Sequence, residues 1–129
     1  MTTQLIINLP VNSLGAAQEF YTALGFKYNE EMSDEVASCF NVNEHIVIAL
    51  LPIEEFKRTI GGNKVADATT NETLLAMAVD SRQAVDDFAD KAIAAGGKEL
   101  YDPTDLPGIY GRAIKDLDNH LLNAYYTSK

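Results

Sequence analysis

The sequence predicts an α+β fold made of two tandem modules, each with the element order strand, helix, strand, strand, strand (βαβββ). The main observation is an internal repeat. Val11-Asn12-Ser13 recurs as Val79-Asp80-Ser81, and Asn43-Glu44-His45 recurs as Asp118-Asn119-His120. In both halves, β-rich segments flank one amphipathic helix. We therefore expect a single domain in which the two modules form a curved mixed sheet around a cleft.

The first module is expected to cover about residues 1–61 and to begin with a strand that ends near Pro10. Ser13 can cap a helix, whose apolar stripe recurs at helical spacing and which Gly25 ends. Beyond this helix, the sequence predicts three strands and then a short helix that begins at Pro52. The three strands lie at about 26–31, 36–42 and 45–51, and the short helix at 52–60.

The second module is expected over about residues 73–129, after a polar linker at about 62–72. A strand at 73–79 leads into a helix that Ser81 opens and Gly96-Gly97 ends. Further strands are predicted at about 98–101, 109–115 and 120–127. Asp118-Asn119 forms the last turn, because both residue types tolerate a positive φ.

Composition and charge limit the classes of function. The chain has 129 residues, a formal net charge of −9 and one cysteine, Cys39. An acidic field repels phosphate backbones and anionic membranes, so we expect neither a nucleic-acid nor a membrane partner. The N-terminal residues lack the pattern of a signal peptide, and a lone cysteine favours a reducing compartment. We therefore expect a cytoplasmic protein in which Cys39 is a buried structural thiol.

Period-two alternation predicts which strand residues face the helices. One apolar set is expected to pack under the helices, and it includes Val47, Ala49, Leu122 and Ala124. The other set is expected to line the cleft: Ile6, Asn8, Ile48, Leu50, Leu74, Ala76, Asn123 and Tyr125.

The chain resembles the vicinal oxygen chelate superfamily, which includes glyoxalase I, bleomycin resistance proteins and extradiol dioxygenases. The likeness rests on Leu9-Pro-Val-Asn-Ser-Leu, on Glu19-Phe-Tyr-Thr-Ala-Leu-Gly-Phe26 and on Gly111-Arg-Ala-Ile-Lys-Asp-Leu-Asp-Asn-His120. Asn119 stands where the superfamily usually has glycine, which is compatible with the turn. The resemblance extends over nearly the whole chain and implies the two-module fold. It does not settle the activity, because one fold hosts many chemistries.

The resemblance also implies where a metal would be held in the superfamily's enzymes, by four inward His or Glu side chains. Offsets from the motifs place those positions at Ile6, Ile48, Leu74 and Asn123. Three of these side chains are aliphatic and offer no lone pair. We therefore expect no metal and no other cofactor. His45 and His120 follow turns and are expected to be structural or surface residues. The acidic turn at residues 30–35 is expected to be a solvated loop, with a weak cation site as the alternative.

The leading hypothesis is a metal-independent protein that binds a small organic ligand, either aromatic or cationic, and forms homodimers as the resemblance implies. The residues expected to bind the ligand are Asn8, Phe40, Ile48, Arg112, Asn123 and Tyr125. For Arg112, a surface ion pair with Asp116 or Asp118 is an equal alternative. Two other functions stay open. One is a lyase, isomerase or dioxygenase with a non-standard site, and the other is a non-catalytic module whose cleft is filled.

Overall fold

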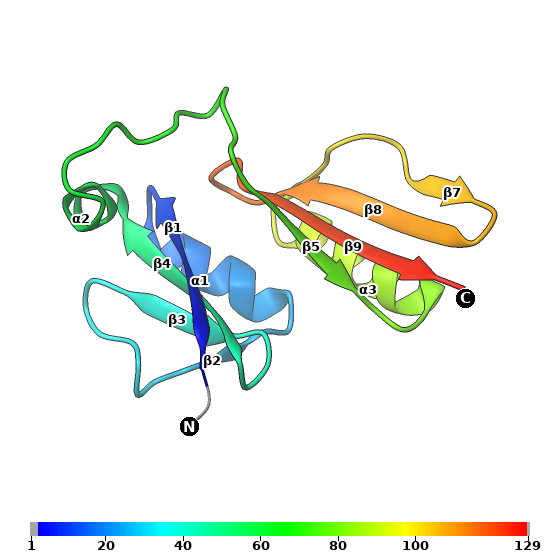
Figure 1. Ribbon diagram of the computed structural model, residues 1–129, viewed down its shortest axis with the longest axis horizontal. Coiled ribbons are helices and arrows are strands. Elements are labelled where there is room, and N and C mark those ends of the chain that lie inside the picture. The colour runs from blue at the N-terminus through cyan, green and yellow to red at the C-terminus, as the bar shows by residue number, and fades with distance from the viewer. Residues whose placement is uncertain (1–2, 129) are drawn as a thin grey trace. The chain divides into compact units, whose positions relative to one another are not determined.

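The computed structural model describes residues 3–128 and consists of two compact units, Met1–Val65 and Ala66–Lys129. Each unit contains one mixed sheet with a helix on one face, so the α+β fold class is confirmed (Figure 1). The face that carries α1 or α3 is called the helix face here, and the other is called the opposite face. None of the helices formed by residues 3–128 has the length and apolar character needed to span a bilayer. The cleft between modules stays a prediction.

The first unit has a four-stranded sheet in the order β1-β4-β3-β2. Its first and last strands, β1 (Leu5–Val11) and β4 (Ile46–Pro52), pair in parallel. The other pairings are antiparallel and involve β2 (Lys27–Tyr28) and β3 (Ser38–Asn41). The helices are α1 (Leu14–Ala23) and α2 (Ile53–Thr59).

The second unit repeats this arrangement with the order β5-β9-β8-β6. Here β5 (Leu74–Ala78) pairs in parallel with β9 (Leu121–Thr127), and β8 (Ile109–Lys115) lies beside β9. The helix α3 (Arg82–Ala94) precedes β6 (Lys98–Glu99). The extra strand β7 (Thr104–Leu106) pairs with β8, so this sheet has five strands.

Predicted caps and turns position both helices. The Ser13 hydroxyl accepts a hydrogen bond from the Ala16 backbone N–H at 3.2 Å, and Ser81 does the same for Ala84 at 3.0 Å. Each satisfies one of the unpaired donors of the first helical turn. In the turn before β9, Asn119 has a φ of 68°. The left-handed conformation expected of Asn119 is therefore confirmed.

Aromatic and aliphatic side chains fill the helix face of each sheet. In the first unit, Phe20 and Tyr21 of α1 are buried, and the Tyr21 ring centroid lies 6.1 Å from that of Phe40 on β3. In the second unit, Val85 of α3 packs with Ala124 of β9. Burial of these apolar side chains supplies most of the driving force for folding.

Three details of the sequence prediction were wrong. Residues 104–106 form β7, which was not predicted, and β2 contains two residues where six were expected. The residues of β4 were also assigned to the wrong faces of the sheet. Ile48 pairs with Phe40 and Leu50 with Ser38, so these β4 residues point to the helix face. Val47 and Ala49 then point to the opposite face, because successive side chains alternate along a strand.

Candidate functional site

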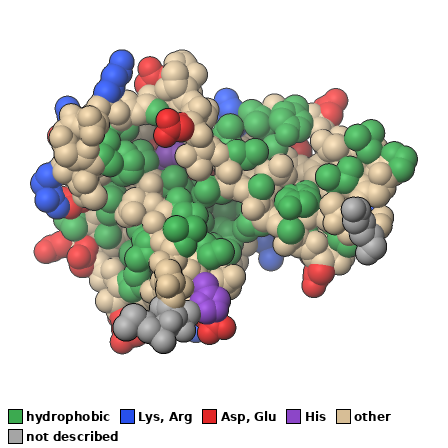
Figure 2. Space-filling model, viewed as in Figure 1, with side chains coloured by type: hydrophobic (Ala, Val, Ile, Leu, Met, Phe, Trp, Pro, Cys, Tyr) green, Lys and Arg blue, Asp and Glu red, His purple; other side chains and the backbone are tan. Residues whose placement is uncertain are grey.

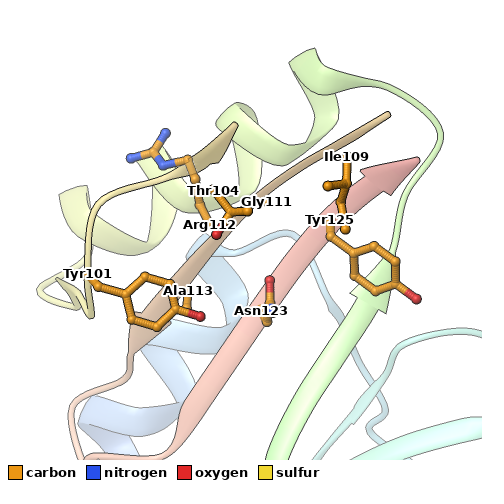
Figure 3. Close-up of a pocket in the computed structure, with 8 residues that line it drawn as sticks. All are labelled: Tyr101, Thr104, Ile109, Gly111, Arg112, Ala113, Asn123 and Tyr125. Carbon is orange, nitrogen blue, oxygen red and sulfur yellow. The ribbon is translucent and has the colours of Figure 1, made fainter. Parts of the chain in front are cut away.

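A pocket of about 210 Å³ lies on the opposite face of the second sheet (Figure 3). Asn123 and Tyr125 belong to this face because they alternate along β9 with Ala124, which packs against α3. The lining residues come from β7, β8, β9 and the segment before β7: Tyr101, Thr104, Ile109, Gly111, Arg112, Ala113, Asn123 and Tyr125. The pocket therefore belongs to a single module.

The structure brings together only some of the residues predicted to bind a ligand. Asn123 and Tyr125 both line the pocket, and Figure 3 shows Tyr101 and Tyr125 on opposite sides of Asn123. Tyr101, Thr104 and Ile109 were not among the predicted site residues. Thr104 lies on β7, which was not predicted, and Tyr101 and Ile109 lie at the ends of predicted strands. A signal was present in Pro107-Gly108, a turn pair in which Gly108 has a φ of 84°. That turn joins β7 to β8 as a hairpin.

The floor of the pocket combines a missing side chain with a buried amide oxygen. Gly111 lies opposite Tyr125 in the β8–β9 ladder. A methyl group on Gly111 would lie 3.1 Å from Tyr125 Cβ and 3.6 Å from Asn123 Oδ1, so glycine keeps this space open. Asn123 Oδ1 is buried and has no hydrogen-bond partner among residues 3–128. Such an atom is uncommon, since most buried polar side-chain atoms are paired.

Arg112 lines the pocket only with its inner part, because its side chain points to the helix face. It pairs with Ala124 across the ladder, and its guanidinium is directed away from Asn123 (Figure 3). The guanidinium donates hydrogen bonds to Glu99 of β6 at 2.8 and 3.1 Å and to Asp86 and Asp90 of α3 at 3.1 and 3.0 Å. The prediction that this guanidinium contacts a ligand is therefore wrong. Its partners are Glu99, Asp86 and Asp90, and not Asp116 or Asp118 as the alternative proposed.

These charges shift the pKa values of the groups around Arg112. The hydrogen bonds that Arg112 donates to Glu99 hold the pKa of Arg112 above its ordinary value. The pKa of Asp86 is lowered, first by a hydrogen bond from the Tyr110 hydroxyl at 2.6 Å and then by Arg112. The same bond raises the pKa of Tyr110. These shifts favour a charged Arg112, a charged Asp86 and a neutral Tyr110, which are the states that form the hydrogen bonds between α3 and the sheet. The cluster therefore has a structural role.

In the first module, the corresponding face is covered by its own loop. Cys39, Val47 and Ala49 form a buried cluster on the opposite face, and Met32 and Ala37 pack against it. Burial raises the pKa of the Cys39 thiol, as expected for a structural cysteine. The residues 29–37 therefore occupy the space where the second module has a pocket.

Side-chain hydrogen bonds hold this loop over the sheet. The Asn29 amide donates to Asn41 Oδ1 at 2.9 Å, and Asn29 Oδ1 accepts from the Met32 backbone N–H at 3.0 Å. The Ser33 hydroxyl accepts from the Cys39 backbone N–H at 2.9 Å. The bonds from Met32 and Cys39 satisfy backbone N–H groups, which is a general role of Asn and Ser side chains in turns.

The remaining predicted residues of the first module do not form a pocket together. Phe40 and Ile48 are buried on the helix face, beside Tyr21 and opposite each other in the ladder. Their predicted contact with a ligand in the cleft is wrong, because β4 has the inverted phase described above. Asn8 points to the opposite face but is exposed. His45 and the acidic residues 30–35 lie on turns, and no group of three His, Cys, Asp or Glu side chains within residues 3–128 could hold a metal ion.

Comparison with known proteins shows what this arrangement is similar to. Residues 5–43 match the model of the bleomycin resistance protein-like N-terminal family. The hypothetical protein SA1046 from S. aureus is 28% identical, with a TM-score of 0.81 over 98% of this chain and 94% of that one. A glyoxalase/bleomycin resistance protein/dioxygenase family enzyme from Burkholderia phytofirmans is 19% identical, with a TM-score of 0.79 over 95% and 97%. No curated protein matches the sequence of the chain.

The chain has the vicinal oxygen chelate fold. The expected resemblance to that superfamily is therefore confirmed. A lactoylglutathione lyase from Agrobacterium tumefaciens shares the fold at 16% identity, with a TM-score of 0.69 over 98% of this chain and 94% of that one. At such identities the likeness shows the architecture alone, so the activity has to be argued from the residues of the site.

The pairing within the two sheets corrects one of the four positions at which the resemblance implies a metal ligand. Asn8 pairs with Ala49 in the first sheet, as Ala76 pairs with Asn123 in the second. Ala49, rather than Ile48, is therefore the equivalent of Asn123. The shift by one residue arises at the turns, where Val42 N–H bonds to Ile46 O in one module and Asp116 N–H to His120 O in the other. His120 thus aligns with Ile46 and not with His45.

This donor set does not fit the metal of the vicinal oxygen chelate enzymes. The four positions hold Ile6, Ala49, Leu74 and Asn123. Alkyl side chains have no lone pair, and one neutral amide oxygen is a weak ligand for the divalent metals that imidazole and carboxylate bind. With Ala49 in place of Ile48, the set still consists of three aliphatic side chains and one amide.

Proposed function

We propose that the chain is a metal-independent small-molecule-binding protein of the glyoxalase and bleomycin-resistance type, and that its ligand occupies the pocket of the second module. The observation that supports this most is a mainly apolar pocket of about 210 Å³ with one unpartnered polar atom, Asn123 Oδ1, at its floor. Ligand sites are typically apolar cavities with a few placed polar groups. This pocket is smaller than the roughly 300 Å³ at which drug-sized sites begin.

The lining favours an aromatic ligand over a cationic one. Its residues include two tyrosines and no carboxylate, and the only charged group, that of Arg112, is directed to the helix face. In Figure 2, acidic side chains are scattered over the visible face of the molecule and do not gather over one element. The net charge of −9 therefore has no local counterpart in the pocket that would select a cation.

Two other functions predict different behaviour. An isomerase, lyase or dioxygenase of this superfamily would need a metal held by residues outside the usual positions. A filled, non-catalytic module would bind nothing, and the loop with Met32 gives the first module this character. The homodimer and the cytoplasmic location expected from the sequence stay predictions.

The test is a titration of the isotope-labelled protein with indole, followed by amide NMR. We expect saturable shifts at Gly111, Ala113 and Asn123. Thr104→Trp, which places a bulky ring in the pocket lining, should abolish them. Leu106→Trp is the matched control, because Leu106 lies two residues away on β7, is 60% exposed and is not in the lining. Absence of saturable shifts at these amides would reject the proposal.

Metal independence is tested on the same preparation. After incubation with Zn²⁺, Ni²⁺, Mn²⁺ and Fe²⁺ followed by desalting, we expect much less than one metal ion per chain by mass spectrometry. Indole binding should not change when EDTA is added. About one retained ion per chain, or loss of binding with EDTA, would favour the enzyme hypothesis.

A further inference from the structure

The Asn123 amide gives the pocket a buried hydrogen-bond acceptor. Its Oδ1 has no donor among residues 3–128. The cross-strand neighbours of Asn123 are Ala113 on β8 and Ala76 on β5, and neither side chain can donate a hydrogen bond. No donor from residues 3–128 reaches this oxygen in the structure, so a donor brought by a ligand would satisfy it.

The amide can present its oxygen to the pocket at little cost. The terminal torsion of asparagine is soft and has broad, roughly two-fold minima. Because Oδ1 makes no hydrogen bond among residues 3–128, turning it from Gly111 toward the cavity breaks none. Gly111 also leaves the space beside this oxygen without a side chain, and a methyl group there would lie 3.6 Å from it.

The walls of the pocket limit the shape and charge of the ligand. Tyr101 and Tyr125 lie on either side of Asn123, and Ile109 adds an aliphatic surface (Figure 3). Aromatic side chains favour planar partners in stacked or edge-on contact. The lining contains no carboxylate that would compensate a buried cation. A neutral, planar molecule fits these constraints.

We propose that the pocket selects a small, neutral heteroaromatic molecule with one N–H or O–H donor, and that this donor binds Asn123 Oδ1. The inference rests on the proposed function, since it assigns the ligand class of the same pocket. Asn123 then determines specificity at the position where the superfamily's enzymes place a metal ligand.

The test compares indole with benzofuran, which has the same two-ring shape but an oxygen in place of the N–H group. Dissociation constants would be measured by amide NMR on the full chain. We expect wild-type protein to bind indole about tenfold more tightly than benzofuran, the effect of one well-made hydrogen bond to an otherwise unpaired acceptor. Asn123→Leu should remove this preference and still bind benzofuran.

Two further variants make the result specific. Asn123→Asp keeps an acceptor and should keep the preference for indole. Asn63→Leu makes the same type of change at an exposed site outside the pocket lining and should behave as wild type. Equal binding of both probes by wild type, or an unchanged preference in Asn123→Leu, would reject the donor inference alone. If neither probe shifted the pocket amides of wild type, the proposed function would fail with it.

Discussion

The two modules share a topology but use the opposite face of the sheet differently. Cys39 and Ala49 in the first module occupy the ladder positions of Ala113 and Asn123 in the second. In the first, residues 29–37 fold back and place Met32 on this face. In the second, the equivalent segment forms β7 at the edge of the sheet, and the face has a pocket. The connection before the penultimate strand of each module therefore decides whether that face is filled.

The helix faces differ as well, in how the helix is joined to the sheet. Ser38 and Arg112 occupy equivalent positions, since Ser38 pairs with Leu50 and Arg112 with Ala124. The Ser38 hydroxyl donates to Gln18 of α1 at 3.0 Å, whereas Arg112 binds two carboxylates of α3. The first contact is neutral and the second is ionic, so the modules should respond differently to mutation and salt.

The largest expected effect is that of Arg112→Met. The Arg112 side chain is only 11% exposed, and its removal leaves Asp86, Asp90 and Glu99 close together without the cation that pairs with all three. We expect a loss of about 2–3 kcal/mol in the free energy of unfolding, below the range for fully buried pairs because the carboxylates are partly exposed. Urea unfolding followed by circular dichroism would measure it.

Ser38→Ala is the matched change in the first module and should cost about 1 kcal/mol, the value of one neutral hydrogen bond. Added salt should decrease the difference between wild type and Arg112→Met, and should leave the effect of Ser38→Ala unchanged. Equal costs for the two variants would contradict the distinction between an ionic and a neutral attachment.

Met32→Ala should have the next largest effect and would make the two modules more alike. Met32 is partly buried against Cys39, Val47 and Ala49, so its truncation should cost about 1–2 kcal/mol, less than for a fully buried methionine. It should also open an apolar cavity on the first sheet. Amide NMR with benzofuran would then show new shifts at Cys39 and Ala49.

The control for Met32→Ala is Glu31→Ala, an exposed neighbour on the same loop. It should change neither stability nor binding. If Met32→Ala were as stable as wild type and gave no new shifts, the loop would not be what fills this face.

The smallest effects are expected where the modules are alike. Ser13→Ala and Ser81→Ala each remove a helix cap with the same geometry, and each should cost about 1 kcal/mol. Thermal unfolding of the two variants would measure this. A difference of more than about 1 kcal/mol would show that the modules differ in local helix stability and not only in their loops and ionic contacts.

Local signals in the sequence were sufficient for much of the fold. The caps at Ser13 and Ser81 and the positive φ of Asn119 follow from the chemistry of single residues and were predicted correctly. The repeated motifs predicted the order of strands and helix along each module. Asn123 and Tyr125 were assigned to the right face because the last turn fixes the phase of β9.

The errors arose where phase or pairing depends on distant contacts. The repeated motifs aligned His45 with His120 in sequence, but the turn hydrogen bonds align His120 with Ile46. A shift of one residue moves every side chain of a strand to the other face of the sheet. β4 is apolar on both faces, so its own pattern could not reveal this. The direction of the Arg112 side chain depends on the carboxylates of α3 and β6, which no local pattern identifies.

The position of the segments 29–37 and 100–108 has a consequence for how such proteins diversify. Both segments connect strands. Residues 29–37 lie over the opposite face of the first sheet, and they are not part of the core between that sheet and α1. A change in either segment can therefore close or open one face while the buried packing under the helix is kept. After a duplication, each copy can gain or lose a binding site separately, so one half can preserve foldability while the other acquires new specificity.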